Sequence, residues 1–282
     1  MGALDELRKR LQQKSSTQLT VGNTEGASAL EKLSARIEPL SEEQARIDIE
    51  EGIDDTTLAK RIDENTAHIN TLVDKSISMG GTEGIITSNL NLFHANQAKD
   101  AYDTQISLTL FADKAFPIII GQSSKKHFEL KPYKVSGYGT ALYDSIVYAS
   151  REIEKCEPAK HIIHLIITDG EDNTGKPVDE AKKLITDKRS KGEHFFLLSN
   201  GYPDAKTLAR RLGIDVEFAA DFSAAGDGFR IVFDSIERVL WQLRTRGAVN
   251  RDWADNIDAH KQNPRLPYDE VKLLTCGRSD GR

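Results

Sequence analysis

Hydrophobic and polar positions alternate in blocks from residue 66 to about residue 245, and these blocks predict strands and helices in turn. Short apolar runs with β-branched residues are typical of buried strands, whereas apolar residues spaced three and four apart are typical of helices. The expected strands cover residues 69–73, 105–112, 116–120, 162–168, 195–199 and 216–220. The expected helices cover residues 86–101, 141–155, 178–191, 205–212 and 229–244. This alternation indicates a doubly wound, mostly parallel α/β sheet flanked by helices.

Two of the strand patterns help to define the sheet. Residues 105–112 alternate between apolar and polar positions, and a short turn at Asp113 and Lys114 separates them from the run at 116–120. That spacing predicts a hairpin and therefore one antiparallel strand at the edge of the sheet. Residues 162–168, IIHLIIT, form a nearly continuous apolar run. Such a run is typical of a central parallel strand that is buried on both faces.

The flanking regions have a different pattern, so we expect an α/β domain over residues 66–246 between an N-terminal arm, 1–65, and a C-terminal tail, 247–282. The arm is polar, with apolar helical stripes near its start and at residues 30–37, a Ser- and Gly-rich linker at 15–28 and a capping box at Ser41. We expect a partly helical arm that packs on the domain or is partly disordered; a helical partner-docking segment is the alternative. The tail is polar and is expected to be mobile or draped on the surface.

Composition narrows the class of protein. The chain has 282 residues and a formal net charge of −6, which argues against a general nucleic-acid binder. It contains no run of about 18 apolar residues, and its first residues lack the apolar segment of a secretory signal. Cys156 and Cys276 are far apart and indicate neither a disulfide framework nor a metal-binding spacing. We therefore expect a cytoplasmic protein with no membrane or nucleic-acid partner.

The loop after the first expected strand carries a cluster of oxygen-bearing side chains. Asp74, Ser76 and Ser78 follow one another at every second position in the sequence DKSISMGG. One carboxylate and two hydroxyls suit a hard divalent cation such as Mg²⁺ better than Zn²⁺ or copper. The D-x-S-x-S pattern occurs by chance in many loops, so its weight depends on the segments that follow.

Two further polar segments are expected to reach the same place. Thr140 follows Gly137 and Gly139 at the start of an expected helix, and Asp169 directly follows the long apolar run. Ligands of open α/β sheets bind beyond the carboxyl ends of parallel strands, near the point where the strand order reverses. Because Asp74 and Asp169 both fall at such ends, we expect the three segments to converge.

This three-part arrangement resembles the metal-ion-dependent adhesion site (MIDAS) of the von Willebrand factor type A (VWA) family. The resemblance covers residues 66–245, with all five site positions in the expected order. The phrases GYGTALYDSI, IITDGEDNTG and KGEHFFLLSNGYPDAKTLARRLGI are most similar to the intracellular bacterial and phage type. One residue departs from the family pattern: Ile77 stands between the two serines, where glycine is usual. Its side chain would narrow the loop and could tilt Ser78.

The resemblance implies a Rossmann-like VWA fold and a specific division of labour at the site. Ser76, Ser78 and Thr140 would bind Mg²⁺ directly through neutral hydroxyls, with Mn²⁺ or Ca²⁺ as the other candidate ions. Asp74 and Asp169 would act through waters and through hydrogen bonds to those hydroxyls. The weakly neutralised ion would then accept a Glu or Asp carboxylate from a partner protein.

The expected function is accordingly a non-enzymatic, metal-dependent protein-binding module, an adaptor or assembly factor in a bacterial or phage multi-protein system, which the resemblance places beside AAA+ ATPases. One alternative is a metal-dependent hydrolase or phosphotransfer enzyme. The sequence has neither a G-x-S-x-G elbow nor a phosphate-binding P-loop, and Lys75 and Lys176 are the only candidate anion-stabilising cations in the loops. The other alternative is a scaffold with a vestigial metal site.

Other conspicuous residues have structural interpretations. His161 and His164 are three apart on a strand, so they point to opposite faces and cannot share a metal ion. Trp241 is expected in the core, whereas Trp253 in the polar tail leaves a partner contact open. Three acidic residues near the site are interpreted without a metal role, as a loop brace or as solvated loop acids: Asp144, Glu171 and Asp172.

Overall fold

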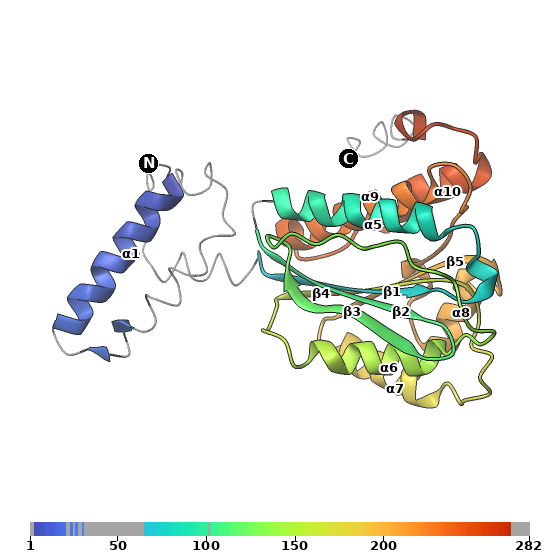
Figure 1. Ribbon diagram of the computed structural model, residues 1–282, viewed down its shortest axis with the longest axis horizontal. Helices are drawn as coiled ribbons and strands as arrows, with labels where there is room; N and C mark the ends of the chain where they lie inside the picture. Colours follow the sequence, from blue (N-terminus) through green and yellow to red (C-terminus); the bar gives the residue numbers. More distant parts are fainter. Residues whose placement is uncertain are drawn as a thin grey trace.

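The computed structural model describes residues 3–20, 23–24, 26–27, 30, 65–100 and 102–271. Residues 65–271 form a three-layer body in which a six-stranded sheet lies between two layers of helices (Figure 1). The strands are β1 (Ala67–Asp74), β2 (Thr104–Phe111), β3 (Ala115–Ser123), β4 (His161–Gly170), β5 (His194–Tyr202) and β6 (Ala219–Asp221). The described helices are α1 (Ala3–Thr20), α5 (Glu83–Lys99), α6 (Leu142–Ile153), α7 (Asp179–Ser190), α8 (Ala205–Leu212), α9 (Gly228–Arg246) and α10 (Asp255–Gln262), with short 3₁₀ turns η1 (Ile77–Met79), η2 (Val216–Phe218) and η3 (Arg251–Ala254).

The strand order is β3-β2-β1-β4-β5-β6, with every neighbouring pair parallel except β2 and β3, which form the antiparallel edge. The predicted α/β fold with one antiparallel edge strand is therefore confirmed. The chain moves outward from β1 through β2 to β3, and then returns to β4 on the other side of β1. The gap between the carboxyl ends of β1 and β4 is thus the point at which the strand order reverses, where open α/β sheets bind ligands.

Each face of the sheet has its own hydrophobic core. Helices α5, α9 and α10 cover one face of the sheet, and α6, α7 and α8 cover the other (Figure 1). All eight residues of β1 are buried, which agrees with a central strand covered on both sides. The site at the ends of β1 and β4 therefore stands on central strands that are covered on both faces.

Two element predictions need correction. Residues 216–220 were expected to be a strand, but Val216–Phe218 form η2, closed by a hydrogen bond from Phe218 N to Asp215 O of 2.8 Å, and only Ala219–Asp221 pair with β5. The linker expected from residue 15 is helical as far as Thr20, within α1. The hydroxyls of Ser16, Thr17 and Thr20 donate to carbonyls four residues back, so these side chains find their partners within the helix. The second apolar stripe beyond Leu30 and the capping box at Ser41 lie outside the described residues.

Residues after α9 are part of the body. Trp253 is fully buried, packs edge-on against Phe196 with ring centroids 4.9 Å apart, and donates from its indole nitrogen to Glu217 O at 2.7 Å. Trp241, by contrast, is 53% exposed. The expectation that Trp241 lies in the core is therefore wrong, and Trp253, for which a partner contact was left open, lies in the core instead. The segment carrying Trp253 covers the sheet, whereas Trp241 lies off the buried stripe of α9, which continues from Leu240 to Leu243.

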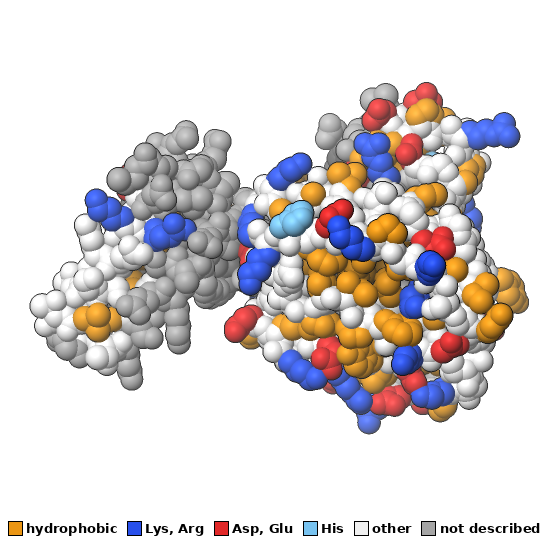
Figure 2. Space-filling model, viewed as in Figure 1, with side chains coloured by type: hydrophobic (Ala, Val, Ile, Leu, Met, Phe, Trp, Pro, Cys, Tyr) orange, Lys and Arg blue, Asp and Glu red, His pale blue; other side chains and the backbone are white. Residues whose placement is uncertain are grey.

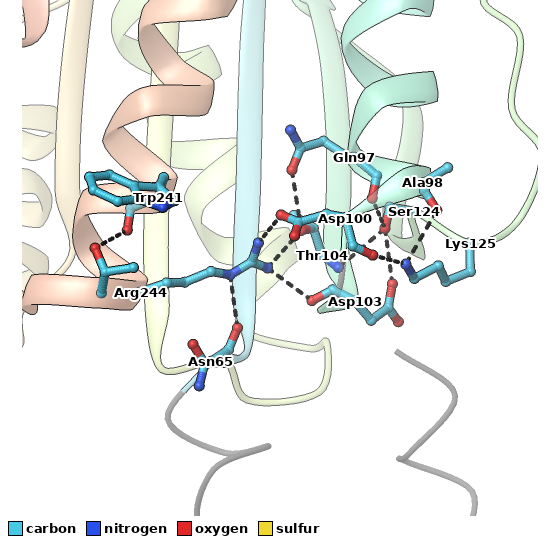
Figure 3. A network of polar contacts seen from close by, with 11 residues as sticks. Asn65, Gln97, Ala98, Asp100, Asp103, Thr104, Ser124, Lys125, Trp241 and Arg244 are labelled. Carbon is cyan, nitrogen blue, oxygen red and sulfur yellow. Dashed lines mark hydrogen bonds and ion pairs between the residues drawn. The ribbon is translucent and has the colours of Figure 1, made fainter. Parts of the chain in front are cut away.

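A buried arginine fastens the opposite end of the sheet, where β1 and β2 begin. The Arg244 guanidinium pairs with Asp100, donates to Thr104 Oγ1 at 3.0 Å and donates to the Asn65 carbonyl at 3.1 Å (Figure 3). Its side chain is only 5% exposed, so the charge depends on these partners. The cluster joins α9 to the residues where the chain enters β1 and β2.

Gln97 and His164 are buried polar residues on α5 and β4. Gln97 interrupts the apolar face of α5, and its side-chain oxygen accepts from Thr104 Oγ1 at 3.4 Å. His164 stacks on Phe195 with ring centroids 4.1 Å apart and is bonded to Glu193 through Nε2 at 2.7 Å. His164 is thus a structural residue, as the sequence predicts.

Among the described residues, no helix has the length and apolar character needed to cross a bilayer.

Candidate metal centre

The three polar segments meet at the carboxyl ends of β1 and β4. Asp74 is the last residue of β1, Asp169 is the penultimate residue of β4, and Thr140 lies two residues before α6. Ser76 and Ser78 belong to the turn that leads into and through η1. All five residues that the sequence predicts for the site therefore lie at the carboxyl end of the sheet. They belong to three segments: the first loop follows β1, the second loop precedes α6, and the third loop begins at the end of β4.

The carboxylate of Asp74, at the end of β1, organises the first loop through hydrogen bonds. Its carboxylate is fully buried; Oδ1 accepts from the Ser76 backbone N–H at 2.8 Å, and Oδ2 accepts from Thr168 Oγ1 at 2.7 Å. Burial raises the pKa of Asp74, opposed by these hydrogen bonds, and the nearby Asp169 charge raises it further. Since both oxygens already accept protein hydrogen bonds, Asp74 is placed to orient the loop and to supply negative charge near an ion.

A chain of hydroxyls leads from the first loop to the third. The Ser78 hydroxyl donates to Asp169 Oδ1 at 2.9 Å, and the Ser76 and Ser78 Oγ atoms are 2.9 Å apart. Because the single Ser78 proton is given to Asp169, Ser76 is the donor in the second bond. Adjacent oxygens in an octahedral Mg²⁺ shell with bonds of 2.0–2.1 Å are also about 2.9 Å apart. The two serines therefore have the spacing of neighbouring ligands of one small hard cation.

Thr140 is held by both neighbouring loops. Its backbone N–H donates to Asn173 Oδ1 at 2.7 Å, and the Asn173 N–H donates to the Thr140 carbonyl at 3.3 Å. Gly139 N donates to Asp113 Oδ1 at 2.7 Å. A Cβ at Gly139 would come within 2.5 Å of the same oxygen, and Gly137 has φ +88°, which favours glycine. The two glycines thus make room for the Asp113 carboxylate, which sets the position of the loop.

Asp113 and Asn173 are site residues that sequence reasoning missed. Asp113 lies in the turn between β2 and β3, which the sequence predicts only as a hairpin connection. Its position just after a strand that ends beside β1 was the available signal. Asn173 had none, because its role depends on backbone atoms of a loop 33 residues earlier.

Ile77 does not distort the site. Its side chain is 45% exposed, and its backbone N–H donates to the Gly137 carbonyl at 3.2 Å. Ser136 N likewise donates to Lys75 O at 2.9 Å, so the first and second loops are joined by two backbone hydrogen bonds. The extra side chain points into solvent while Ser78 keeps its bonds to Ser76 and Asp169.

The remaining acids of the third loop have structural partners. Asp172 Oδ2 accepts from the Tyr143 N–H at 2.9 Å, within the first turn of α6, and Asp172 Oδ1 accepts from Thr174 N at 2.9 Å. The interpretation of Asp172 as a solvated loop acid is therefore wrong, since it satisfies a backbone donor that a helix start leaves free. Glu171 pairs with Arg211. Asp144 pairs with Lys176 and so braces the loop against α6.

The chemistry of the donor set fits a hard divalent cation. In the described part of the chain, no group of three or more His, Cys, Asp or Glu side chains could hold a metal ion. A metal here would instead be bound by hydroxyl oxygens, with Asp74 and Asp169 contributing charge through hydrogen bonds and water. Burial raises the pKa of Asp169, opposed by the hydrogen bond from Ser78.

No family model and no curated protein matches the chain. Similar solved structures include proximal thread matrix protein 1 from the mussel byssus, at 19% identity and a TM-score of 0.45 over 64% of this chain and 45% of that one. A structure of the same mussel protein with a zinc-occupied MIDAS motif matches at 19% identity and a TM-score of 0.43, covering 72% of this chain and 51% of that one. The ArnB paralog VWA2 from Sulfolobus acidocaldarius matches at 18% identity and a TM-score of 0.43, covering 62% and 45%. This chain spans about half the length of these proteins.

The mostly parallel sheet, its antiparallel edge strand and the three converging segments agree with what the sequence predicts. Residues 67–246 therefore have the doubly wound α/β fold that the resemblance to VWA domains implies. Whether the chain belongs to the intracellular bacterial and phage type stays a prediction from the sequence.

Proposed function

We propose that this domain is a divalent-metal-dependent protein-binding module. Ser76, Ser78 and Thr140 bind the ion directly, and Asp74 and Asp169 hold its waters and orient the hydroxyls. The observation that carries this proposal is the hydrogen-bonded chain from Ser76 through Ser78 to Asp169 at the strand-order switch point.

The ion supplies a positive charge that neutral hydroxyls neutralise only weakly. Mg²⁺ usually keeps several waters in its octahedral shell, and a carboxylate oxygen can replace one of them. The partner is thus a protein that presents an Asp or Glu side chain. Mg²⁺ is the first choice, and Mn²⁺ or Ca²⁺ accept the same oxygen ligands.

An adaptor or assembly role in the cytoplasm, beside an AAA+ ATPase in a bacterial or phage multi-protein system, is the finer part of the proposal. It rests on the sequence resemblance and is carried over by analogy with that family.

The enzyme alternative has less support than the binding module. A phosphotransfer site needs a cation aimed at the transferred group. Lys75 donates to Ser136 Oγ at 2.6 Å and lies over the Phe116 ring at 4.1 Å from its centroid. Lys176 pairs with Asp144. Both cations named by the sequence are thus engaged with other groups.

The test is calorimetric titration of chelator-treated protein with Mg²⁺ and with Mn²⁺. Ser78→Ala removes the central hydroxyl of the site, and Ser88→Ala is the matched control, because the Ser88 hydroxyl is exposed on α5 and bonds only to the Gly84 carbonyl at 2.9 Å. We expect saturable binding of one ion by the wild type and by Ser88→Ala, and its loss in Ser78→Ala.

Absence of binding to the wild type, or equal binding by Ser78→Ala, would contradict the metal centre. Capture of a cellular partner that persists in chelator and in Ser78→Ala would instead favour the scaffold with a vestigial site.

A further inference from the structure

Three large hydrophobic side chains stand in solvent around the metal centre. Tyr138 is 91% exposed, Tyr202 is 88% exposed and Ile77 is 45% exposed. We call these three residues the apolar rim. Figure 2 shows hydrophobic side chains at the end of the body where η1 and α8 lie in Figure 1.

Each residue of the apolar rim belongs to a site loop or adjoins one. Ile77 lies between the two site serines, and its N–H bonds to the carbonyl of Gly137, the neighbour of Tyr138. The Tyr138 carbonyl accepts from Asn173 Nδ2 at 3.3 Å, and Asn173 also holds Thr140. Tyr202 pairs across β4 and β5 with Gly170, which directly follows Asp169.

Their exposure is unusual within this molecule. Nine large hydrophobic side chains of the described residues are exposed, and the two most exposed are the tyrosines of the rim. Scattered exposed hydrophobic residues are normal on protein surfaces, so the weight of these three residues comes from their shared position on or beside the site loops. Tyrosine is also enriched at interface centres, where its ring is buried and its hydroxyl stays solvated.

The charges of two side-chain pairs beside the rim already have partners within the chain. Glu171 is paired with Arg211, and Lys176 is paired with Asp144. The three rim side chains have no such partner among the described residues and offer apolar surface to a protein that brings a carboxylate to the ion.

We propose that the partner presents its metal-binding Glu or Asp among aromatic or branched aliphatic side chains that pack on the apolar rim. A short peptide with an apolar residue two positions before and two positions after its Glu tests this, because residues two apart in an extended segment point to the same side. The inference rests on the proposed function, because the carboxylate needs the metal.

The experiment measures fluorescence anisotropy of three labelled peptides with the full chain in Mg²⁺. The first is Gly-Ser-Phe-Ser-Glu-Ser-Leu-Ser-Gly, the second has serine in place of Phe and Leu, and the third has Gln in place of Glu. We expect the first peptide to bind about tenfold or more tightly than the second, since only the first can bury apolar side chains, Phe and Leu, against the rim. The third peptide should not bind, and chelator should release the first.

Two variants separate the rim from the metal. The double variant Tyr138→Ser/Tyr202→Ser should bind metal as the wild type does by calorimetry, yet lose the preference for the first peptide. Tyr148→Ser, which changes an exposed tyrosine on α6 that is 36% exposed, should keep it.

Equal affinity for the first two peptides, an unchanged preference in the double variant, or uptake of metal without capture of either glutamate peptide would overturn the inference. Failure of the proposed function is distinguishable, because the wild type would then take up no metal.

Discussion

The Ser78 hydroxyl donates to Asp169 Oδ1 at 2.9 Å, although the two residues are 91 positions apart in the chain. This bond joins the loop after β1 to the end of β4. It depends on the register of the two strands, in which Val73 lies opposite Ile167, so that Asp74 reaches Thr168 Oγ1 at 2.7 Å. The geometry of the site is therefore set by the pairing of the two central strands.

Asp74 should contribute to both metal affinity and stability. Asp74→Ala leaves the Ser76 N–H and the Thr168 hydroxyl without their acceptor, and we expect the free energy of unfolding to fall by about 1–3 kcal/mol together with loss of metal binding. Asp74→Asn keeps one oxygen for Ser76 and can donate to Thr168 Oγ1, so it should lose metal affinity with a smaller loss of stability. Urea denaturation and calorimetry check the two effects. Undiminished metal binding by Asp74→Asn would contradict a role for the carboxylate charge.

Gly139 and Asp113 should be energetically coupled. In Gly139→Ala the new Cβ would lie within 2.5 Å of Asp113 Oδ1, so the Thr140 loop or the carboxylate must move. Overpacking of this kind costs about 1–3 kcal/mol, and we expect metal affinity to fall about tenfold. Removal of the obstructing carboxylate in Gly139→Ala/Asp113→Ala should restore part of that affinity. Calorimetric titration of the two single variants and the double variant gives the coupling; simple additivity would argue against the close contact.

The sequence predicts those features that depend on regular patterns. Apolar blocks locate the central strands, and the five site residues follow from the resemblance and from their positions, because each lies at or just after a strand end or just before a helix start. The roles of Asp113 and Asn173 were not predicted, because both residues accept hydrogen bonds from backbone atoms of another loop and no local sequence pattern indicates such a contact. The burial of Trp253 was not predicted, because its segment is mostly polar, although its few apolar residues complete the core.

The exposure of Trp241 could have been predicted from the helical period of α9. Ile236, Leu240 and Leu243 follow the spacing of a buried helical stripe, whereas Trp241 is five residues after Ile236 and falls on the outer face. The helical period therefore places this side chain in solvent, and size and hydrophobicity alone are misleading.

The two tryptophans should have opposite effects on stability. Trp253→Ala removes a fully buried indole that packs on Phe196, and we expect the free energy of unfolding to fall by about 3–5 kcal/mol. Trp241→Ala should change it by about 1 kcal/mol at most, since the side chain is 53% exposed and its ring has a cation–π contact with Arg246, 5.2 Å from the ring centroid. Urea unfolding of both variants checks the difference. Similar losses would mean that the segment after α9 adds little to the core.

His94 on α5 should make stability depend on pH. Its ring lies under Phe128, with centroids 5.1 Å apart, and neither ring nitrogen has a hydrogen-bond partner among the described residues. Burial lowers the pKa of His94 from 6.5 to about 4. Between these values the unfolded chain takes up a proton that the folded chain does not, so stability is full above pH 6.5 and falls as the pH drops toward about 4.

Replacement of His94 by leucine should therefore flatten the dependence of the unfolding free energy on pH. The slope between about pH 6.5 and pH 4 should fall by up to about 1.4 kcal/mol per pH unit, on the order of 3 kcal/mol in total. The dependence does not vanish, because burial also lowers the pKa of His68 to about 4. Phe93→Leu is the matched control, since it changes a buried neighbour on α5 without removing a titrating group. Urea denaturation at about pH 7.5 and about pH 5 measures both slopes, and an unchanged slope in His94→Leu would mean that the imidazole is protonated in the folded state.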